Sequence, residues 1–374
     1  MSDKHAVYFT QLNGIRFLAV FLVLMDHWLV PTIPFPLGHL GVVIFFVLSG
    51  FLITRILFQS ADDVANKGHS PWKKIKTFIL RRSLRIFPIY FLILFIGGYL
   101  GIEPFSEVWK WLVFYMPDFY IMIHRQWIGV WDHLWSLAVE EQYYLIFPYF
   151  ILFLPRKYFG KLFPWMIALG FCSRLFFYLL TSHDFKETSW MWSYVNPFSA
   201  IDSFGLGGLL AYFYHYRQAT FKRISEIKYI LPITLASFFL VLWFSHLAEY
   251  TYDNIWFIVI ERSVAAIFSF FLIAEAVSER QHIFGRFLSL SWVDYLGKIS
   301  YGLYLYHNFI YNYYHQEGNT LWWAISKYMP LFQTNFLNFI WSKFFINLIL
   351  LLFVASISWF VIEKPINSFK DKLK

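Results

Sequence analysis

The chain has 374 residues, of which 59% are hydrophobic and only 14% carry a charge. Ordinary soluble domains are about half apolar and a quarter charged, so this composition indicates a membrane protein and argues against a soluble one. The net charge of +8 could suggest a nucleic-acid partner, but the positive residues gather in short segments between apolar runs, so we expect none. The single cysteine excludes an internal disulfide.

Ten apolar runs follow one another along the chain, each about 18–24 residues and so long enough to cross a bilayer as a helix. They cover residues 12–30, 37–57, 78–100, 133–154, 163–180, 197–214, 229–246, 254–277, 294–313 and 342–362. The aromatic stretch 109–123 is shorter and carries Asp118, and we expect it to be interfacial or re-entrant. No repeat or separate soluble domain is visible. The prediction is an all-α integral membrane protein with a single transmembrane domain over residues 1–374.

The distribution of lysine and arginine predicts the orientation. If the N-terminus is cytoplasmic, the inner segments carry 18 of these residues and the outer segments carry 4, namely Lys110, Arg125, Lys186 and Lys327. Because positive residues favour the cytoplasmic side, we expect an even number of spans with both termini inside. The first run is too long for a cleavable signal peptide and is expected to remain as the first span.

Arg16 and His27 stand out in the first apolar run. Their spacing is almost three helical turns, so both side chains share one helix face. Polar ionisable groups at such depth cost about 2.5–3.5 kcal/mol each on insertion scales, which favours a functional role. Arg16 could instead reach the inner headgroups, and His27 could be a buried histidine bonded to another helix. Asp26 could orient the ring of His27 only indirectly, because adjacent helical residues point about 100° apart.

The third run opens with three arginines, Arg81, Arg82 and Arg85. Arg82 and Arg85 are neighbours on one helix face, and guanidinium groups suit bidentate recognition of phosphate. A plain positive flank on the cytoplasmic side is the alternative. Lysines at 73, 74 and 76 already supply such a flank. We therefore predict that the arginines form a phosphate site at the inner face.

Two further groups of polar residues lie inside predicted spans. Glu140 and Glu141 lie about two turns below the outer surface, near the expected depth of His27. A buried carboxylate there could hold a histidine tautomer, stabilise an imidazolium or pair with arginine. In the ninth run, Tyr301 and Tyr304 are one turn apart with His307 on much the same side. Core packing with satisfied hydroxyls is the alternative for these three.

Together these pieces form an ordered set of motifs. They are Leu12-Asn13-Gly14-Ile15-Arg16 with His27, Gly41-Val42 followed by residues 45–53, Arg82 with Arg85, Trp135-Ser136-Leu137 followed by Val139-Glu140-Glu141-Gln142, Ile299-Ser300-Tyr301 leading to Tyr306-His307, and Ile362-Glu363-Lys364-Pro365. In this order the chain resembles the membrane acyltransferase-3 family, which modifies bacterial surface glycans and some small molecules. Asn13 departs from the aspartate of many relatives, and Val43 from an acidic or polar residue. We expect the stand-alone form, without a fused esterase-like domain.

The resemblance implies an O-acyltransferase in the bacterial cytoplasmic (inner) membrane. The donor would be cytoplasmic acyl-CoA, with acetyl as the expected acyl group, and the acceptor a hydroxyl of a surface glycan such as lipopolysaccharide or exopolysaccharide, or of its lipid-linked precursor. No metal and no permanently bound cofactor are expected, and no motif predicts an oligomeric state. His27 would act as general base, with Glu141 or Glu140 fixing its orientation and Asp26 beside it. A two-step route through a transient acyl-imidazole on His27 is the alternative. The other expected site residues are Arg16, Arg81, Arg82 and Arg85 for the donor phosphates, and Trp135, Ser136, Tyr301, Tyr304 and His307 for the substrate.

The same ionisable residues are also typical of a different class of protein. Buried arginine, histidine and glutamate also build proton relays, so a proton-coupled transporter of a sugar or small metabolite is the alternative. A noncatalytic scaffold ranks last, because it leaves the ionisable residues within the spans unexplained.

Overall fold

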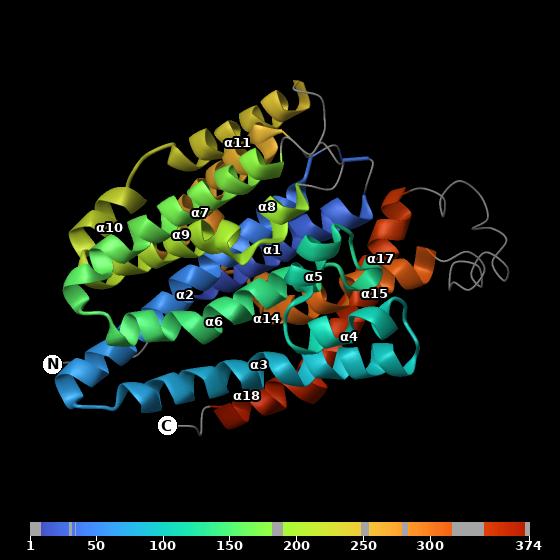
Figure 1. The fold of residues 1–374 in the computed structure, drawn as a ribbon, viewed down its shortest axis with the longest axis horizontal. Helices are drawn as coiled ribbons and strands as arrows, with labels where there is room; N and C mark the ends of the chain where they lie inside the picture. Colours follow the sequence, from blue (N-terminus) through green and yellow to red (C-terminus); the bar gives the residue numbers. More distant parts are fainter. Residues whose placement is uncertain are drawn as a thin grey trace. The chain divides into compact units, whose positions relative to one another are not determined.

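The computed structural model describes residues 9–29, 32–33, 35–181, 190–247, 254–278, 283–315 and 340–370. Within these ranges every regular element is a helix, as the composition predicts (Figure 1). The chain divides into two compact units, each drawn from three separate stretches. The first unit takes Met1–Ala19, His39–Pro71 and Ile146–Lys298, and the second takes Val20–Gly38, Trp72–Leu145 and Ile299–Lys374. Lys186 and Lys327, used above for the orientation, lie outside the described residues.

The first unit is built mainly from the middle of the chain. Its helices are the first half of α1 (Thr10–Trp28), most of α2 (Leu37–Lys67), the end of α6 (Leu134–Phe153), η2 (Arg156–Tyr158), α7 (Phe159–Thr181), α8 (Met191–Val195), α9 (Pro197–Tyr216), α10 (Gln218–Ser225), α11 (Ile230–Leu247), the π-helix η3 (Trp256–Glu261), α12 (Arg262–Val277), α13 (Ile283–Leu288) and α14 (Ser291–Lys298). Helices α7 and α9 pack side by side, and α11 packs on η3 and α12 (Figure 1).

Glycines set the closest approach within this unit. A Cβ added to Gly207 of α9 would meet the carbonyl oxygen of Val47 on α2, and one added to Gly50 of α2 would meet the carbonyl of Phe204 on α9. Small residues let apolar helices bring their backbones together, which is how helices in membranes commonly associate. The Ser49-Gly50 step of the second sequence motif therefore has a packing reason.

The second unit combines the end of α1 with helices from later in the chain. These are α3 (Pro71–Tyr99), α4 (Phe105–Val113), α5 (Pro117–His124), η1 (Gly129–Trp131), the first part of α6, α15 (Ser300–His315), α17 (Ile340–Ser358), the π-helix η5 (Trp359–Glu363) and α18 (Lys364–Lys370). Helices α15 and α17 pack against each other.

The aromatic stretch 109–123 folds as part of two short helices, α4 and α5, which are too short to cross a bilayer. The prediction that it does not span is consistent with this break. The hydroxyl of Tyr90 on α3 donates to the carbonyl of Leu112 at 2.8 Å and fixes α4. Gln142 on α6 donates to both carboxylate oxygens of Asp118, at 3.1 and 3.2 Å, and fixes α5.

All ten predicted apolar runs contain helix in the described residues, but fewer helices are long and apolar enough to cross a membrane. By length and composition these number four, or five if a pair bent by 67° is one span. They are Leu37–Lys67, Arg156–Leu180, Trp256–Val277, Lys343–Ser368 and the bent pair Gln218–Ser225 with Ile230–His246. Helices α1 and α6, which carry most of the predicted site residues, are not among them, because polar side chains reduce their hydropathy. The count of ten spans is therefore not confirmed.

Candidate active site

His27 has two hydrogen-bond partners on a single nitrogen. Its Nδ1 lies 2.8 Å from Nε2 of His307 and 3.2 Å from Oδ1 of Asn308. Both partners come from consecutive positions of α15, while His27 lies near the end of α1. His307 is fully buried and His27 only partly so.

The bonds of His307 determine which proton each ring carries. Nδ1 of His307 lies 2.5 Å from the carbonyl oxygen of Tyr304. A carbonyl oxygen can only accept, so Nδ1 of His307 carries its proton and, in the neutral ring, Nε2 is an acceptor. Nδ1 of His27 must therefore be the donor to His307.

Asn308 requires the same assignment independently. Its Nδ2 lies 3.2 Å from Nδ1 of His133, whose Nε2 lies 3.1 Å from the carbonyl of Leu305. That carbonyl takes the proton of His133 Nε2, so His133 Nδ1 accepts from the amide of Asn308. The amide oxygen of Asn308 then faces His27 and needs a donor there.

Both chains of hydrogen bonds place the proton of neutral His27 on Nδ1. Nε2 of His27 is left with a lone pair, and it makes no hydrogen bond to any residue that the structure describes. A partly exposed imidazole with one nitrogen held and the other available as acceptor has the arrangement required of a general base.

Of the expected substrate-binding residues, Trp135, Ser136, Tyr304 and His307 are buried and Tyr301 is partly buried. The hydroxyls of Ser136 and Tyr304 lie 2.6 Å apart, and each lies 3.1 Å from the carbonyl of His133. Tyr301 donates to the carbonyl of Ile86 at 3.1 Å. In this arrangement their polar atoms position α3, α6 and α15, and direct contact with substrate stays a prediction for them, for buried Trp135 and for His307.

The two glutamates form no direct hydrogen bond to His27 among the described residues. Glu140 accepts from the Tyr144 hydroxyl at 3.1 Å. Oε1 of Glu141 is buried and has no hydrogen-bond partner in the described part of the chain. The hydrogen bonds of His27 go to His307 and Asn308, so an orienting role for either glutamate stays a prediction. Asp26 acts on His27 electrostatically and packs against Gly38.

Arg82 and Arg85 lie close enough to repel each other, as the spacing predicts. Arg82 lies 5.7 Å from the ring centres of Phe78 and Tyr144, and it attracts Glu141 and Glu140. Neither arginine forms an ion pair with a carboxylate among the described residues. Two like charges held together on α3 in this way suit an anionic ligand. Arg81 is half-buried on the same helix.

Arg16 belongs to the first unit and has different partners. Its Nη1 donates to Oδ1 of Asn13 at 2.6 Å, and Nδ2 of Asn13 donates to Oδ1 of Asp294 at 2.7 Å. Asp294 also pairs with Lys298 at 2.5 Å. Asn13 uses its acceptor for the arginine and its donor for the carboxylate, a combination that an aspartate at this position could not provide.

Three residues of these networks were absent from the predicted site. Asn308 directly follows His307, and His133 lies two residues before Trp135, so a polar residue close to each motif was the available signal. Asp294 has no such signal, because nothing in its local sequence shows that it meets Asn13.

Comparison with known proteins agrees with these motifs. A family described as an acyltransferase domain (Acyl_transf_3) matches residues 9–363. The chain belongs to the acyltransferase-3 family. The matched range includes most of both units. No solved structure is significantly similar to the chain.

Several curated bacterial proteins are similar to this acyltransferase-3 chain. A Staphylococcus aureus (strain COL) protein, provisionally named an O-acetyltransferase, is 25% identical over 97% of this chain and 58% of its own length. The O-acetyltransferase OatA of S. aureus (strain NCTC 8325) is 26% identical over 96% of this chain and 57% of its own. The peptidoglycan O-acetyltransferase OatA of Listeria monocytogenes is 32% identical over 39% of this chain and 24% of its own. The chain thus spans under three fifths of the length of these relatives.

Proposed function

We propose that this acyltransferase-3 chain is a membrane O-acyltransferase that moves an acetyl group from acetyl-CoA to a hydroxyl of a cell-surface glycan. The observation that carries the proposal is the fixed tautomer of His27, whose Nε2 is left as an acceptor. The family and the names of its relatives support O-acetylation as the reaction class.

In the proposed reaction, Nε2 of His27 takes the proton of the acceptor hydroxyl as its oxygen attacks the thioester carbonyl carbon. The new C–O bond forms, the C–S bond breaks, and the proton passes to the departing sulfur, which leaves as free coenzyme A. During the transfer His27 is an imidazolium. Its Nδ1–H bonds to His307 and Asn308 then become charge-assisted and stronger, which stabilises the charged intermediate state.

The donor would be held by its phosphates. Arg82 and Arg85 supply two guanidinium groups without ion-pair partners among the described residues, and Arg81 and Arg16 are the further candidates. Glu141 and Arg82 attract each other electrostatically. The proposed role of Glu141 is therefore to hold that arginine in place rather than to act on His27.

The proposal includes ten spans with both termini in the cytoplasm and a place in the inner membrane of a bacterium, supported by the lysine and arginine distribution. A cytoplasmic donor and an external acceptor would then meet at His27. Lipopolysaccharide, exopolysaccharide and their lipid-linked precursors are the proposed acceptors.

Acetyl transfer by the purified protein tests the assignment. With [acetyl-¹⁴C]acetyl-CoA and lipid-linked glycan from the host membrane, His27→Ala should lose transfer while the matched change of exposed His69, His69→Ala, should keep it. Full transfer by His27→Ala would exclude the base. Thermal stabilisation by coenzyme A separates an acyltransferase from a sugar carrier, which should not respond. Mass spectrometry of surface glycans from cells with and without the chain would identify the ester.

A further inference from the structure

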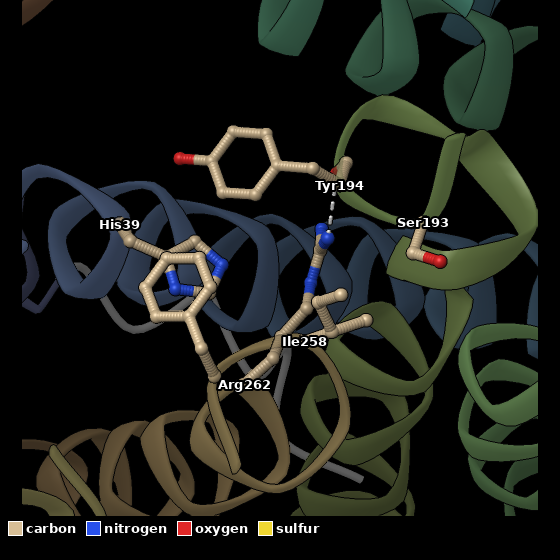
Figure 2. A pocket seen from close by; sticks show the side chains of 6 residues that line it. His39, Ser193, Tyr194, Ile258 and Arg262 are labelled. Carbon is tan, nitrogen blue, oxygen red and sulfur yellow. Dashed lines mark hydrogen bonds between the residues drawn. The ribbon is translucent and has the colours of Figure 1, made fainter. Parts of the chain in front are cut away.

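A small cavity lies within the first unit, among residues that the histidine site does not use. It is lined by His39 of α2, Ser193 and Tyr194 of α8, Phe257 and Ile258 of η3, and Arg262 at the start of α12 (Figure 2). Its size suits an occupant close to one water molecule. Three stretches of the chain that are far apart in the sequence, namely α2, α8 and the consecutive helices η3 and α12, therefore meet around a space for one small ligand.

Arg262 is the main polar group at this cavity. The residue is 1% exposed, and its Nη1 donates to the carbonyl of Tyr194 at 2.8 Å. Its Nε and Nη2 are buried and have no hydrogen-bond partner in the described residues. Unused donors of a buried guanidinium are costly unless an acceptor satisfies them.

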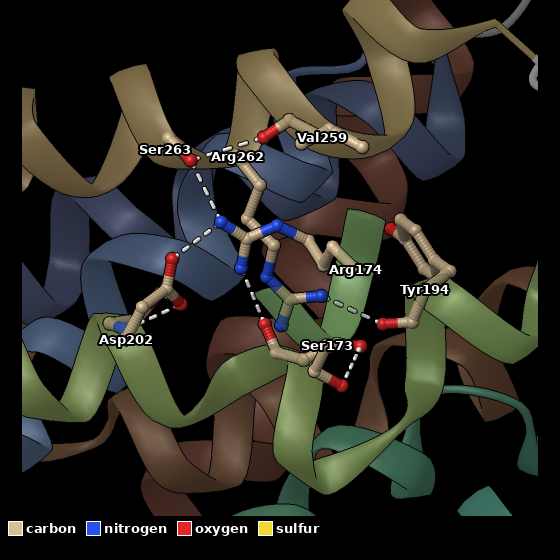
Figure 3. Close-up of polar contacts among 9 residues, drawn as sticks. Ser173, Arg174, Tyr194, Asp202, Val259, Arg262 and Ser263 are labelled. Carbon is tan, nitrogen blue, oxygen red and sulfur yellow. Dashed lines mark hydrogen bonds and ion pairs between the residues drawn. The ribbon is translucent and has the colours of Figure 1, made fainter. Parts of the chain in front are cut away.

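The nearby carboxylates are already paired with other groups. Asp202 pairs with Arg174 at 2.6 Å, and Arg174 also donates to the carbonyl of Ser199 and to Ser263 (Figure 3). Glu261 forms an ion pair with Nδ1 of His39. Both carboxylates act on Arg262 electrostatically, but neither forms an ion pair with it among the described residues.

The two pairs leave the charge of Arg262 without a close counterion. The other close neighbours are aromatic rings: Phe46 lies 5.8 Å from the guanidinium carbon, and Tyr194 and Phe257, which line the cavity, flank the ring of His39. A buried charge without a counterion is strongly destabilising. A bound anion would balance the charge of Arg262 and accept hydrogen bonds from its free N–H groups.

The groups at the cavity exclude two other interpretations. A Ser–His–Glu nucleophile would need the serine hydroxyl on the histidine, but in Figure 2 the hydroxyl of Ser193 points away from the ring of His39. A metal cation does not fit, because it would lie against the positively charged guanidinium of Arg262, whose free N–H groups can only donate.

We propose that this cavity binds a small inorganic anion of halide size between Arg262 and His39. When bound, the anion accepts from the free N–H groups of Arg262 and also attracts the ring of His39, which joins α2 to α12 next to α8. The π-helix η3 ends at Glu261, directly before Arg262, and π-helical turns often occur at functional sites. In cells the occupant is chloride, and it acts as a structural ion of the first unit.

Bromide is the probe for the site, because its anomalous scattering distinguishes it from water. Crystals of the full chain grown in bromide should show an anomalous peak in the cavity beside Arg262. Crystals with ordered water there and no anomalous signal would overturn the proposal. This measurement uses the unchanged protein, so it does not depend on the folding of any variant.

A thermal titration provides the second test. At constant ionic strength, replacing gluconate by chloride should raise the Tm of the wild type by about 3 °C when chloride reaches roughly 100 times its Kd. Arg262→Gln should lose this dependence, whereas the matched change at exposed Arg223, Arg223→Gln, should retain it. A Tm that is the same in chloride and gluconate, or an equal chloride response in Arg262→Gln, would also contradict the site.

Discussion

Nε2 of His307 accepts the Nδ1 proton of His27 across 2.8 Å, because its own Nδ1 donates to the carbonyl of Tyr304. A second imidazole thus takes the position that a carboxylate holds in the serine-protease type of triad. In the proposed mechanism His307 is therefore a positioning residue, while the substrate-binding role expected from the sequence stays a prediction.

Changing His307 should therefore reduce kcat through His27. His307→Leu removes the acceptor and should lower kcat by about 10²–10⁴-fold, the usual contribution of a positioned base. His307→Gln can still accept through its side-chain oxygen and should retain more activity, with KM for both substrates nearly unchanged in either variant. Steady-state kinetics would measure the two, and equal activity of the leucine and glutamine variants would contradict the tautomer argument.

Arg85 should contribute to binding of the donor. Arg85→Gln is expected to raise the KM for acetyl-CoA by about 10- to 100-fold, the value of one charge-assisted hydrogen bond, with a smaller change in kcat. Arg286 is exposed and also lies on the predicted inner side, so Arg286→Gln is the matched control. Equal KM values for the two variants would remove the phosphate role from Arg85.

The contact between α2 and α9 predicts a loss of stability. Gly207→Val places a branched side chain against the backbone of Val47 and should reduce the free energy of unfolding by about 1–3 kcal/mol or more. Ala236→Val puts the same side chain on an exposed part of α11 and should have little effect. Thermal melting in one detergent compares them, and matching melting temperatures would show that the helices are not this close.

Asp118 predicts a pH dependence of stability. Burial raises the pKa of its carboxyl to about 7, although hydrogen bonds from Gln142 act in the opposite direction. The unfolded pKa is about 4, so the folded state binds the proton more tightly, and stability falls as pH rises from about 4 through 7.

Asp118→Asn should make this decline shallower, and Glu107→Gln, at an exposed position on α4, should not. Burial also raises the pKa of Asp132 to about 7, so part of the slope should remain. Tm measured from pH 4.5 to 8 tests the prediction. A slope unchanged by Asp118→Asn would show that this carboxyl is not protonated on folding.

Sequence patterns predicted the helices and the family because both depend on local periodicity and motif order. They also singled out His27 and His307 as site residues, but not that their rings meet. Helical spacing shows which residues share a face, yet it does not show which faces of distant helices pack together. The expectation that Glu140 or Glu141 orients His27 stays a prediction without a direct hydrogen bond in the described residues, because similar depth on two helices does not establish contact.

The amide Asn308 was missed for a related reason. A single asparagine beside a histidine has no distinctive pattern, and its importance comes from facing His27 and His133 at once. The sequence shows that Asn13 departs from the aspartate of many relatives, but it does not show why. In the structure, the Asn13 amide accepts from an arginine and donates to a carboxylate.

Two polar partners of α1 lie in the last quarter of the chain and are made late in translation. The hydrogen bond of Asn13 to Asp294 joins residues that are 281 positions apart, and that of His27 to His307 joins residues that are 280 positions apart. Neither bond can form before the later residue has been synthesised. At bacterial and eukaryotic elongation rates of about 5–20 residues per second, that interval is roughly 15–60 s. Until then Asn13 and His27 on the nascent first helix lack these two hydrogen bonds, and a chain stopped before residue 294 would form neither of them.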